Sequence, residues 1–259
     1  MHDTARILVR DDKFGARAQS RAIRYGDSIL PVLATESDNF RLLNWRNAFW
    51  IADVLGANCS KLSRSMAVNL YSRPGDLPHL VGAVALAEQG DLNTRGVNEL
   101  LASIPKMQGE SEVELGVLAL GKAHAEVAIP MLLSMLDEDG IDYWRNAYAC
   151  DTLARIGDKR AIPTLQSCLR RPNFYALPNA FRALIALGDR NAVPLAIARV
   201  SPDIKGYNSG FVVKELETVT GQQFGFSQTA WAKWWDSVDQ AWHIPPKFLE
   251  PFDRQPQIH

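Results

Sequence analysis

The chain reads Trp144-Arg-Asn-Ala-Tyr-Ala-Cys-Asp-Thr-Leu-Ala-Arg-Ile-Gly-Asp158 and then Lys159-Arg-Ala-Ile-Pro-Thr-Leu-Gln-Ser-Cys-Leu169, and it repeats this pattern over residues 175–200. Each copy is an apolar helix pattern, a Gly-Asp turn, and a proline near the start of a second helix. A fixed period made of two helices is typical of an α-solenoid, in which each unit packs only on its neighbours. The sequence therefore predicts an all-α fold, a right-handed α-solenoid.

The same signals run back toward the start of the chain. Residues 45–49 read Trp-Arg-Asn-Ala-Phe, nearly the Trp-Arg-Asn-Ala-Tyr of residues 144–148. Glycine suits the left-handed position that ends a helix, and an aspartate after it can cap the next one. Turn glycines mark about six HEAT-like helix pairs: Gly26, Gly56, Gly90, Gly121, Gly157 and Gly188.

The ends of the chain differ from the repeats. We expect an N-terminal arm or short helix over residues 1–13, the repeats over 14–202, a C-terminal helical cap over 203–243 and a Pro-rich extended tail over 244–259. One broad helical stripe of the cap holds Trp231, Trp234, Trp235, Val238 and Trp242. Such a stripe predicts a face that closes the end of the solenoid, and an aromatic platform for a ligand is the alternative.

The repeats resemble the HEAT-repeat family, in particular its short bacterial form named after phycobilisome lyases. The resemblance covers roughly residues 14–200 and rests on these marks: Arg145, Ala147, Leu153, Gly157-Asp158, Ala161-Ile162-Pro163, Leu165 and Leu169. It implies second helices that line a concave surface, and a scaffold, because that is what most members of the family are. The second and third repeats depart from the pattern because they lack the proline.

Charge is segregated along a chain whose formal net charge is only −1. Residues 76–143 hold twelve acidic and three basic side chains, whereas residues 144–214 hold four acidic and eleven basic ones. Sequence neighbours stay neighbours in a solenoid, so we expect two adjacent patches that orient a protein partner. Self-association through these patches is the alternative. The acidic middle argues against a nucleic-acid partner.

Motifs that carry chemistry are scarce. Cys59, Cys150 and Cys168 fit neither a disulfide framework nor a metal site, and the five histidines are isolated. The sequence has no phosphate-binding loop, nucleophile elbow or paired Cys–His. We therefore assign no catalytic, cofactor-binding or metal-binding residue, and a non-enzyme is favoured. With no apolar run long enough for a bilayer and no leader, we expect a cytoplasmic protein that binds no membrane.

Four residues are predicted to bind a partner: Arg170, Arg171, Arg199 and Trp234. The arginines belong to second helices, which the resemblance places on the concave surface; a solvated face is the plainer interpretation. Of the adjacent Trp234 and Trp235, one ring can face outward.

Two functions of different classes follow from these observations. The first is a non-catalytic scaffold that mediates protein–protein interaction, as a subunit of a larger assembly. The second follows the resemblance: a lyase-like or chaperone factor for a chromophore or cofactor, which presents a bound protein to a small molecule. The second function requires a nucleophile or base facing the binding surface, and the sequence does not identify one.

Overall fold

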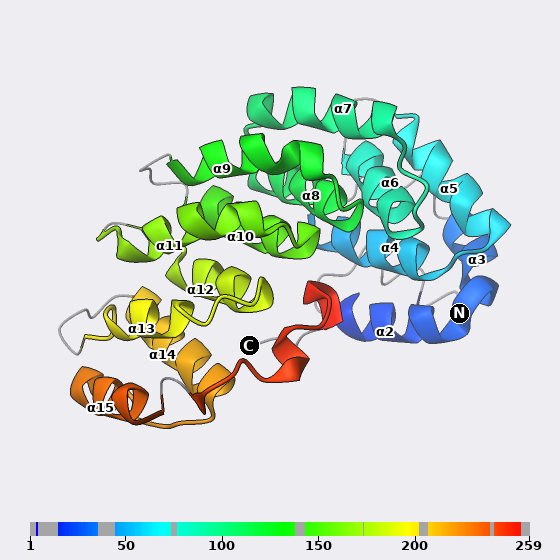
Figure 1. Ribbon diagram of the computed structural model, residues 1–259. Coiled ribbons are helices and arrows are strands. Elements are labelled where there is room, and N and C mark those ends of the chain that lie inside the picture. The colour runs from blue at the N-terminus through cyan, green and yellow to red at the C-terminus, as the bar shows by residue number, and fades with distance from the viewer. Residues whose placement is uncertain are drawn as a thin grey trace. The chain divides into compact units, whose positions relative to one another are not determined.

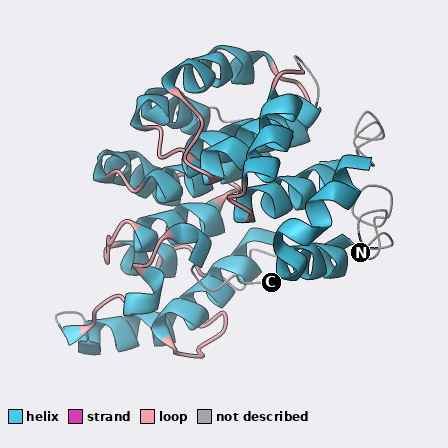
Figure 2. Cartoon of the chain, turned by 90° about the vertical axis from the view of Figure 1, so that its right-hand side faces the viewer, coloured by secondary structure: helices cyan, strands magenta, loops and turns pink. Residues whose placement is uncertain are grey.

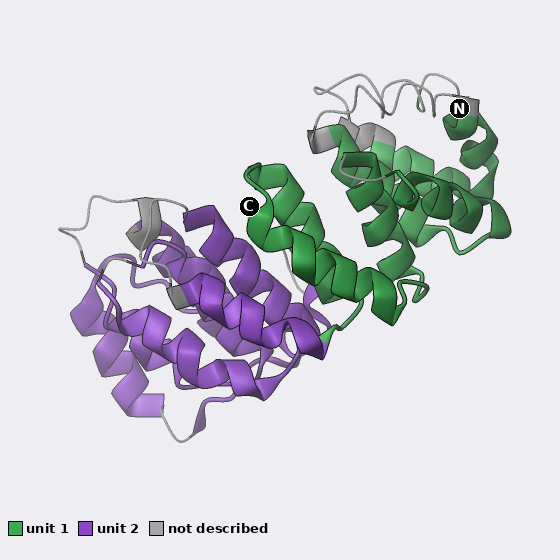
Figure 3. Ribbon diagram, turned by 90° about the horizontal axis from the view of Figure 1, so that it is seen from above, with its two compact units in different colours: residues 1–125 green, residues 126–259 purple. Residues whose placement is uncertain are grey.

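The computed structural model describes residue 4 and residues 15–35, 45–73, 77–137, 143–172, 174–201, 207–238 and 241–254. Across these ranges all regular structure is helical, and no strand occurs among them (Figure 2). The predicted all-α class is confirmed, and helices pack on their neighbours as in a helical repeat. The chain divides into two compact units, unit 1 (Met1–Ala125) and unit 2 (Glu126–His259), shown in Figure 3.

Unit 1 is built from two layers of helices (Figure 1). In the first layer each helix packs on the next: α2 (Gly15–Tyr25), α4 (Trp45–Ala57), α6 (Leu77–Glu88) and α8 (Glu110–Lys122). The second layer holds α3 (Leu30–Thr35), α5 (Lys61–Tyr71) and α7 (Thr94–Ser103). The central helix α6 is apolar on almost every side because it contacts α4, α5 and α8.

Unit 2 repeats this arrangement. Its first layer is α10 (Tyr143–Ile156), α12 (Leu177–Ala186) and α14 (Tyr207–Thr220), each packed on the next. Its second layer is α9 (Ile129–Asp137), α11 (Ile162–Arg170), α13 (Ala192–Ile197) and α15 (Gln228–Val238). The predicted C-terminal cap is thus a helix pair, α14 and α15, that continues both layers of the unit.

The turns between paired helices follow the sequence pattern at most of the marked glycines. Gly26, Gly90, Gly157 and Gly188 have positive φ angles between 54° and 83°. After Gly157, the Asp158 carboxylate accepts a hydrogen bond from the Arg160 amide at 2.7 Å, as expected of a capping residue. The two remaining glycines do not form the turns assigned to them.

Gly56 and Gly121 lie inside helices α4 and α8 instead of at turns. A Cβ atom on Gly56 would come within 2.9 Å of the Glu88 side chain, so close helix packing explains this glycine. Between α8 and α9, His124 takes the left-handed turn position with φ 47°. A histidine in this position gives no sequence signal of a turn, whereas the nearby Gly121 suggests one.

Side-chain hydrogen bonds join neighbouring repeats, as expected of a stacked array. Three of them span 34 positions: Gln19 to Asp53, Gln89 to the Leu55 carbonyl, and Arg160 to Glu126. Later in the chain the separation is shorter, with 31 positions from Gln228 to the Ile197 carbonyl and 27 from Arg199 to the Pro172 carbonyl.

The C-terminal tail differs from its prediction. The prolines do exclude an α-helix, but residues 244–254 are not extended: they form the 3₁₀ turns η7 (Pro246–Phe248) and η8 (Phe252–Arg254). Ile244, Phe248 and Phe252 are buried, because apolar side chains between the prolines pack on the fold. The predicted N-terminal arm, apart from Thr4, and residues 255–259 lie outside the described ranges.

Candidate functional site

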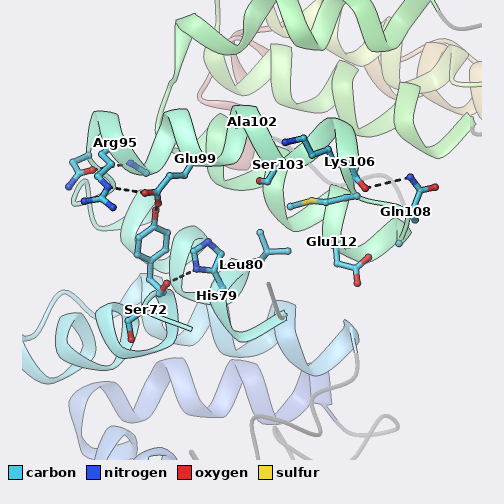
Figure 4. Close-up of a pocket in the computed structure, with 15 residues that line it drawn as sticks. Ser72, His79, Leu80, Arg95, Glu99, Ala102, Ser103, Lys106, Gln108 and Glu112 are labelled. Carbon is cyan, nitrogen blue, oxygen red and sulfur yellow. Dashed lines mark hydrogen bonds and ion pairs between the residues drawn. The ribbon is translucent and has the colours of Figure 1, made fainter. Parts of the chain in front are cut away.

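A pocket of about 1100 Å³ lies in unit 1, where the end of α5 and the start of α6 meet α7, the 3₁₀ turn η3 (Ile104–Lys106) and the start of α8 (Figure 4). We call it the groove. Side chains that define it are Tyr71, His79, Leu80, Arg95, Glu99, Ala102, Lys106, Met107 and Glu112. Seven of the lining residues are exposed, so the groove is open to solvent: Ser72, Asn93, Arg95, Glu99, Ala102, Lys106 and Gln108.

Two glycines bring the walls of the groove together. A Cβ atom on Gly82 would overlap the backbone of Tyr71, so the glycine allows α5 and α6 to approach closely. A Cβ atom on Gly96 would stand 2.9 Å from the Tyr71 hydroxyl, so this glycine makes room for the tyrosine ring against α7. The Asn93 side chain caps the start of α7 by accepting from the Gly96 amide at 3.0 Å.

A tyrosine, a glutamate and an arginine form a hydrogen-bonded chain at one end of the groove. The Tyr71 hydroxyl donates to Glu99 Oε2 at 2.7 Å, and Arg95 Nε donates to Glu99 Oε1 at 2.8 Å. Both oxygens of the Glu99 carboxylate are therefore held, one by each partner. This fixes the carboxylate at the hydroxyl end of the tyrosine ring although Glu99 itself is exposed.

The ionisation of this chain follows from the same contacts. Partial burial, and then the hydrogen bond to Glu99, raise the pKa of Tyr71 to about 12. The pKa of Glu99 is lowered, first by the hydrogen bond from Tyr71 and then by that from Arg95. Tyr71 therefore keeps its proton and Glu99 stays charged at neutral pH.

His79 adds a hydrogen-bond acceptor beside this chain. Its ring stacks on Tyr71 with centroids 4.5 Å apart, and Nδ1 lies 2.5 Å from the Tyr71 carbonyl oxygen. A carbonyl only accepts hydrogen bonds, so Nδ1 carries the proton, and Nε2 of the neutral ring is an acceptor. Among the labelled side chains of Figure 4, His79 lies across the groove from Glu99.

The other end of the groove is formed by the connection from α7 to α8. Pro105 stands in η3, and the chain then leads through Met107 to Gly109, which precedes α8. Lys106 is exposed here, and the Glu112 carboxylate lies against Gly109. Leu80, Ala102 and Met107 supply apolar surface between the two polar ends. The groove thus has an apolar middle with charges of both signs at its ends.

The sequence did not reveal the groove. Nothing in the spacing of Tyr71 and His79 indicates that their rings stack. The glycines that create the contact, Gly82 and Gly96, occur within helices rather than at turns. Two glycines inside apolar helix patterns were the one available signal of close packing.

Two of the predicted partner-binding arginines make hydrogen bonds within unit 2. Arg171 Nη2 donates to the Leu136 carbonyl, and its guanidinium lies 4.9 Å from the centre of the Phe174 ring. Arg199 Nη2 donates to the Pro172 carbonyl at 3.0 Å, and burial lowers its pKa. Each arginine thus satisfies a carbonyl at the end of a preceding second-layer segment. Arg170 is exposed at the end of α11.

Trp234 belongs to an aromatic row in α15 and its flanks. Trp231 is fully buried and donates through Nε1 to the Gly225 carbonyl at 2.9 Å. The ring centroid of Trp234 lies 6.0 Å from that of Trp231 and 5.9 Å from that of Trp235, and Trp234 is only half-buried. The helix packs on α13. The structure therefore places Trp231 and Trp235 in the interior and leaves Trp234 partly accessible.

A second cluster of polar residues lies on the first layer of unit 2, beneath the tail. Two arginines hold the Phe252 ring: the guanidinium carbons of Arg155 (α10) and Arg182 (α12) are 4.9 Å and 5.1 Å from its centroid. Arg155 Nε also donates to Asp253 Oδ1 at 2.8 Å. We call this surface, formed by Asp151, Arg155, Asn179, Arg182 and Glu215, the tail-covered face.

Two carboxylates of the tail-covered face have raised pKa values. Burial raises the pKa of Glu215 to about 8. The charge of Arg182, whose Nε lies 3.9 Å from Glu215 Oε1, lowers this pKa, and the charge of Asp151 raises it further. Burial also raises the pKa of Asp151, although Arg182, Arg155 and the amide of Asn179, which donates at 3.1 Å, favour its charged form. Glu215 Oε2 has no hydrogen-bond partner. Its ion pair is therefore too long to offset the loss of water.

Other reactive groups give no further site. Cys150 and Cys168 are buried, and burial raises the pKa of the Cys150 thiol well above its ordinary value. In the described ranges no three histidine, cysteine, aspartate or glutamate residues come together as metal ligands would. Every helix in the same ranges is too short or too polar to cross a lipid bilayer.

Residues 147–171 match the family model of the PBS lyase HEAT-like repeat. The match covers α10 except for its first four residues, the turn at Gly157 and all of α11. It confirms the resemblance on which the sequence interpretation rested. A comparison with curated proteins gave no match.

Proposed function

We propose that this helical-repeat protein is a scaffold that binds an extended segment of a partner protein in the groove of unit 1. The groove itself is the observation that supports the proposal. It is open along its length, has an apolar middle, and has hydrogen-bonding groups fixed at one end by the chain of Tyr71, Glu99 and Arg95. Fixed polar groups lower the entropy cost of binding because they need no ordering.

The size of the groove favours a peptide segment over a compact small molecule. Pockets for small ligands are about 300–1000 Å³ and enclose most of the ligand surface. This one is about 1100 Å³, and seven of its lining residues are exposed, so a compact molecule would stay largely in water. A chain segment would place an apolar side chain over Leu80, Ala102 and Met107. Its backbone amides could donate to Glu99 and to His79 Nε2.

The lyase-like or chaperone factor remains the alternative. His79 provides a base in the groove, which that function requires, but no described cysteine lines the groove. The two functions differ in what the purified protein would carry. A partner protein alone supports the scaffold, and a coloured small-molecule adduct supports the alternative.

Blocking the groove tests the proposal. We would select peptides from a random library on the wild-type protein and measure their affinities by fluorescence anisotropy. Ala102→Arg places a long side chain over the apolar middle of the groove without disfavouring the helix. Asn98→Arg adds the same charge to an exposed position of α7 that does not line the groove, and is the matched control.

We expect Ala102→Arg to weaken binding by about tenfold or more, which corresponds to about 1.4 kcal/mol. Asn98→Arg should bind as the wild type does. Peptides that bind both variants equally well would show that the groove is not their site.

The basic residues of unit 2 are proposed as a second contact for the same partner. Arg170 is the one to test, because Arg171 and Arg199 hold carbonyl groups of their own unit. Replacing those two would change the fold as well as the charge. Arg170→Glu should slow association at low salt and have little effect at high salt, since Coulomb attraction is screened there. An association rate that does not change at low salt would mean that Arg170 is only solvated.

A further inference from the structure

The tail-covered face is more polar than a surface that only closes a fold. The buried Phe252 ring packs on two arginines, Arg155 and Arg182, and two acids, Asp151 and Glu215, interact with these arginines. Burying such groups is costly unless they are well paired. Arg182 Nε lies 3.9 Å from Glu215 Oε1, and Glu215 Oε2 has no hydrogen-bond partner. Stability alone does not account for this arrangement.

The two arginines contact two features of the tail, an aromatic ring and a carboxylate. The guanidinium groups of Arg155 and Arg182 both lie against the Phe252 ring, a geometry that cation–π attraction favours. Arg155 also donates to the carboxylate of the next residue, Asp253, at 2.8 Å. One arginine therefore contacts both the ring and the acid. Together the two arginines recognise an aromatic residue followed by an acidic one.

The tail is held at its last described turn by these side-chain contacts. The Asp253 side chain is 44% exposed, so water can reach the ion pair. Exposed pairs contribute little to stability, so the last turn, held by this pair and the Phe252 ring, can exchange with a competitor. The buried Ile244 and Phe248 keep the rest of the tail in place. The Leu249 side chain, which precedes this turn, is exposed.

From these contacts we propose that the tail-covered face is a binding site for an aromatic–acidic dipeptide of a partner protein, which Phe252 and Asp253 of the chain occupy. The proposal does not depend on partner binding in the groove. A tethered segment competes at a local concentration in the millimolar range. The partner therefore binds well only when the tail is released or when the partner is present in a larger, multivalent assembly.

The test uses the full chain and a fluorescent peptide with the sequence of residues 246–254, Pro-Lys-Phe-Leu-Glu-Pro-Phe-Asp-Arg. The receptor is the double variant Phe252→Ala, Asp253→Asn, in which the last turn has lost its contacts with both arginines while Ile244 and Phe248 stay in place. Anisotropy should report binding at least about tenfold tighter than to the wild type, because the tethered competitor is gone. Equal affinity for the two proteins would overturn the proposal and leave the tail as a simple cap.

Two substitutions separate recognition from folding. Arg155→Gln in the double variant should weaken binding about tenfold or more, since it removes the charge-assisted hydrogen bond and one cation–π contact. Arg160→Gln, at an exposed arginine of the same unit, should leave it unchanged. A peptide that carries Asp253→Asn should also bind about tenfold more weakly to the unaltered double variant. Equal binding of both peptides would contradict recognition of the acid.

A double variant that fails to fold still leaves a test. The single variant Asp253→Asn keeps the Phe252 ring and removes the charge that pairs with Arg155. It should bind the peptide more tightly than the wild type, though by less than the double variant. No gain of affinity in this variant would refute exchange of the tail.

Discussion

Glu99 of unit 1 and Glu215 of unit 2 each lie beside an arginine, yet their pKa values shift in opposite directions. Glu99 accepts hydrogen bonds from Tyr71 and Arg95 at the open groove, and its pKa is lowered. Glu215 is buried, its arginine is 3.9 Å away, and its pKa is raised to about 8. Distance to the partner and access to water decide the sign, because burial penalises charge and short hydrogen bonds favour it.

The two glutamates represent two uses of one architecture. Both units stack a first and a second layer of helices, but the groove is open to solvent, whereas in unit 2 the Phe252 ring of the tail packs on arginines of α10 and α12. Polar groups at the open site are held by one another and remain hydrated. The carboxylates at the tail-covered face are shielded from water, and burial raises their pKa values. We therefore expect variants of unit 2 to change stability, and variants of the groove to change binding.

The largest effect is expected from the aromatic interior of unit 2. Trp231→Ala should lower the free energy of unfolding by about 3–5 kcal/mol, because the ring is fully buried and its indole nitrogen is hydrogen-bonded. Trp234→Ala, at a half-buried neighbour, should cost only about 1 kcal/mol. Urea unfolding followed by circular dichroism gives both values. Equal losses would mean that Trp231 is not the anchor of the cap.

The next effect is a pH dependence that separates the two glutamates. Folded Glu215 keeps its proton up to about pH 8, whereas in the unfolded chain it loses the proton near its ordinary pKa of 4.5. The folded state therefore binds more protons between these values, and stability falls as pH rises through this window. Glu215→Gln removes the loss. The difference in free energy of unfolding between Glu215→Gln and the wild type should therefore shift in favour of the variant by about 2–4 kcal/mol from pH 5 to pH 9.

Glu99→Gln is the matched comparison. The lowered pKa of Glu99 means that its contribution is fully present above its ordinary pKa and is lost only at more acidic pH. The difference between this variant and the wild type should therefore stay constant from pH 5 to pH 9. A slope for Glu99→Gln, or none for Glu215→Gln, would reverse the assignment of open and covered sites.

The smallest effect is expected from the hydroxyl group of Tyr71. Tyr71→Phe keeps the ring and its stacking on His79 but removes the hydrogen bond to Glu99. The loss of stability should be about 1 kcal/mol, the usual value for one hydrogen bond at a partly hydrated site. Binding of a groove peptide should weaken more than stability falls, because Glu99 is no longer held on both sides. Unchanged affinity would remove Glu99 from the binding site.

Much of the fold could be predicted from residues 144–200 because the same sequence pattern occurs there twice. Gly157 and Gly188 take the left-handed conformation, and Asp158 caps the helical turn after it, as the pattern requires. Prediction was wrong at Gly56 and Gly121, where the glycines serve helix packing or lie within a helix. A glycine has two uses, and the sequence alone does not distinguish a turn from a close contact.

The candidate sites could not be predicted in this way because they depend on contacts between different elements. Tyr71 meets Glu99 across 28 positions, and Arg155 meets Asp253 across 98. No local period brings such residues together. Arg171 and Arg199 show the converse: a basic pair that suggested a binding surface also bonds carbonyl groups of its own unit. A charge pattern gives the residues, but the fold decides what they contact.

Hydrogen exchange followed by mass spectrometry tests the central claim most directly, with the full-length protein and a saturating amount of a groove-selected peptide. The account predicts new protection in segments within residues 94–112, which include α7 and the start of α8, and unchanged exchange in residues 244–254. Protection confined to unit 2, with none in residues 94–112, would contradict the claim that the open groove is where this protein binds its partner.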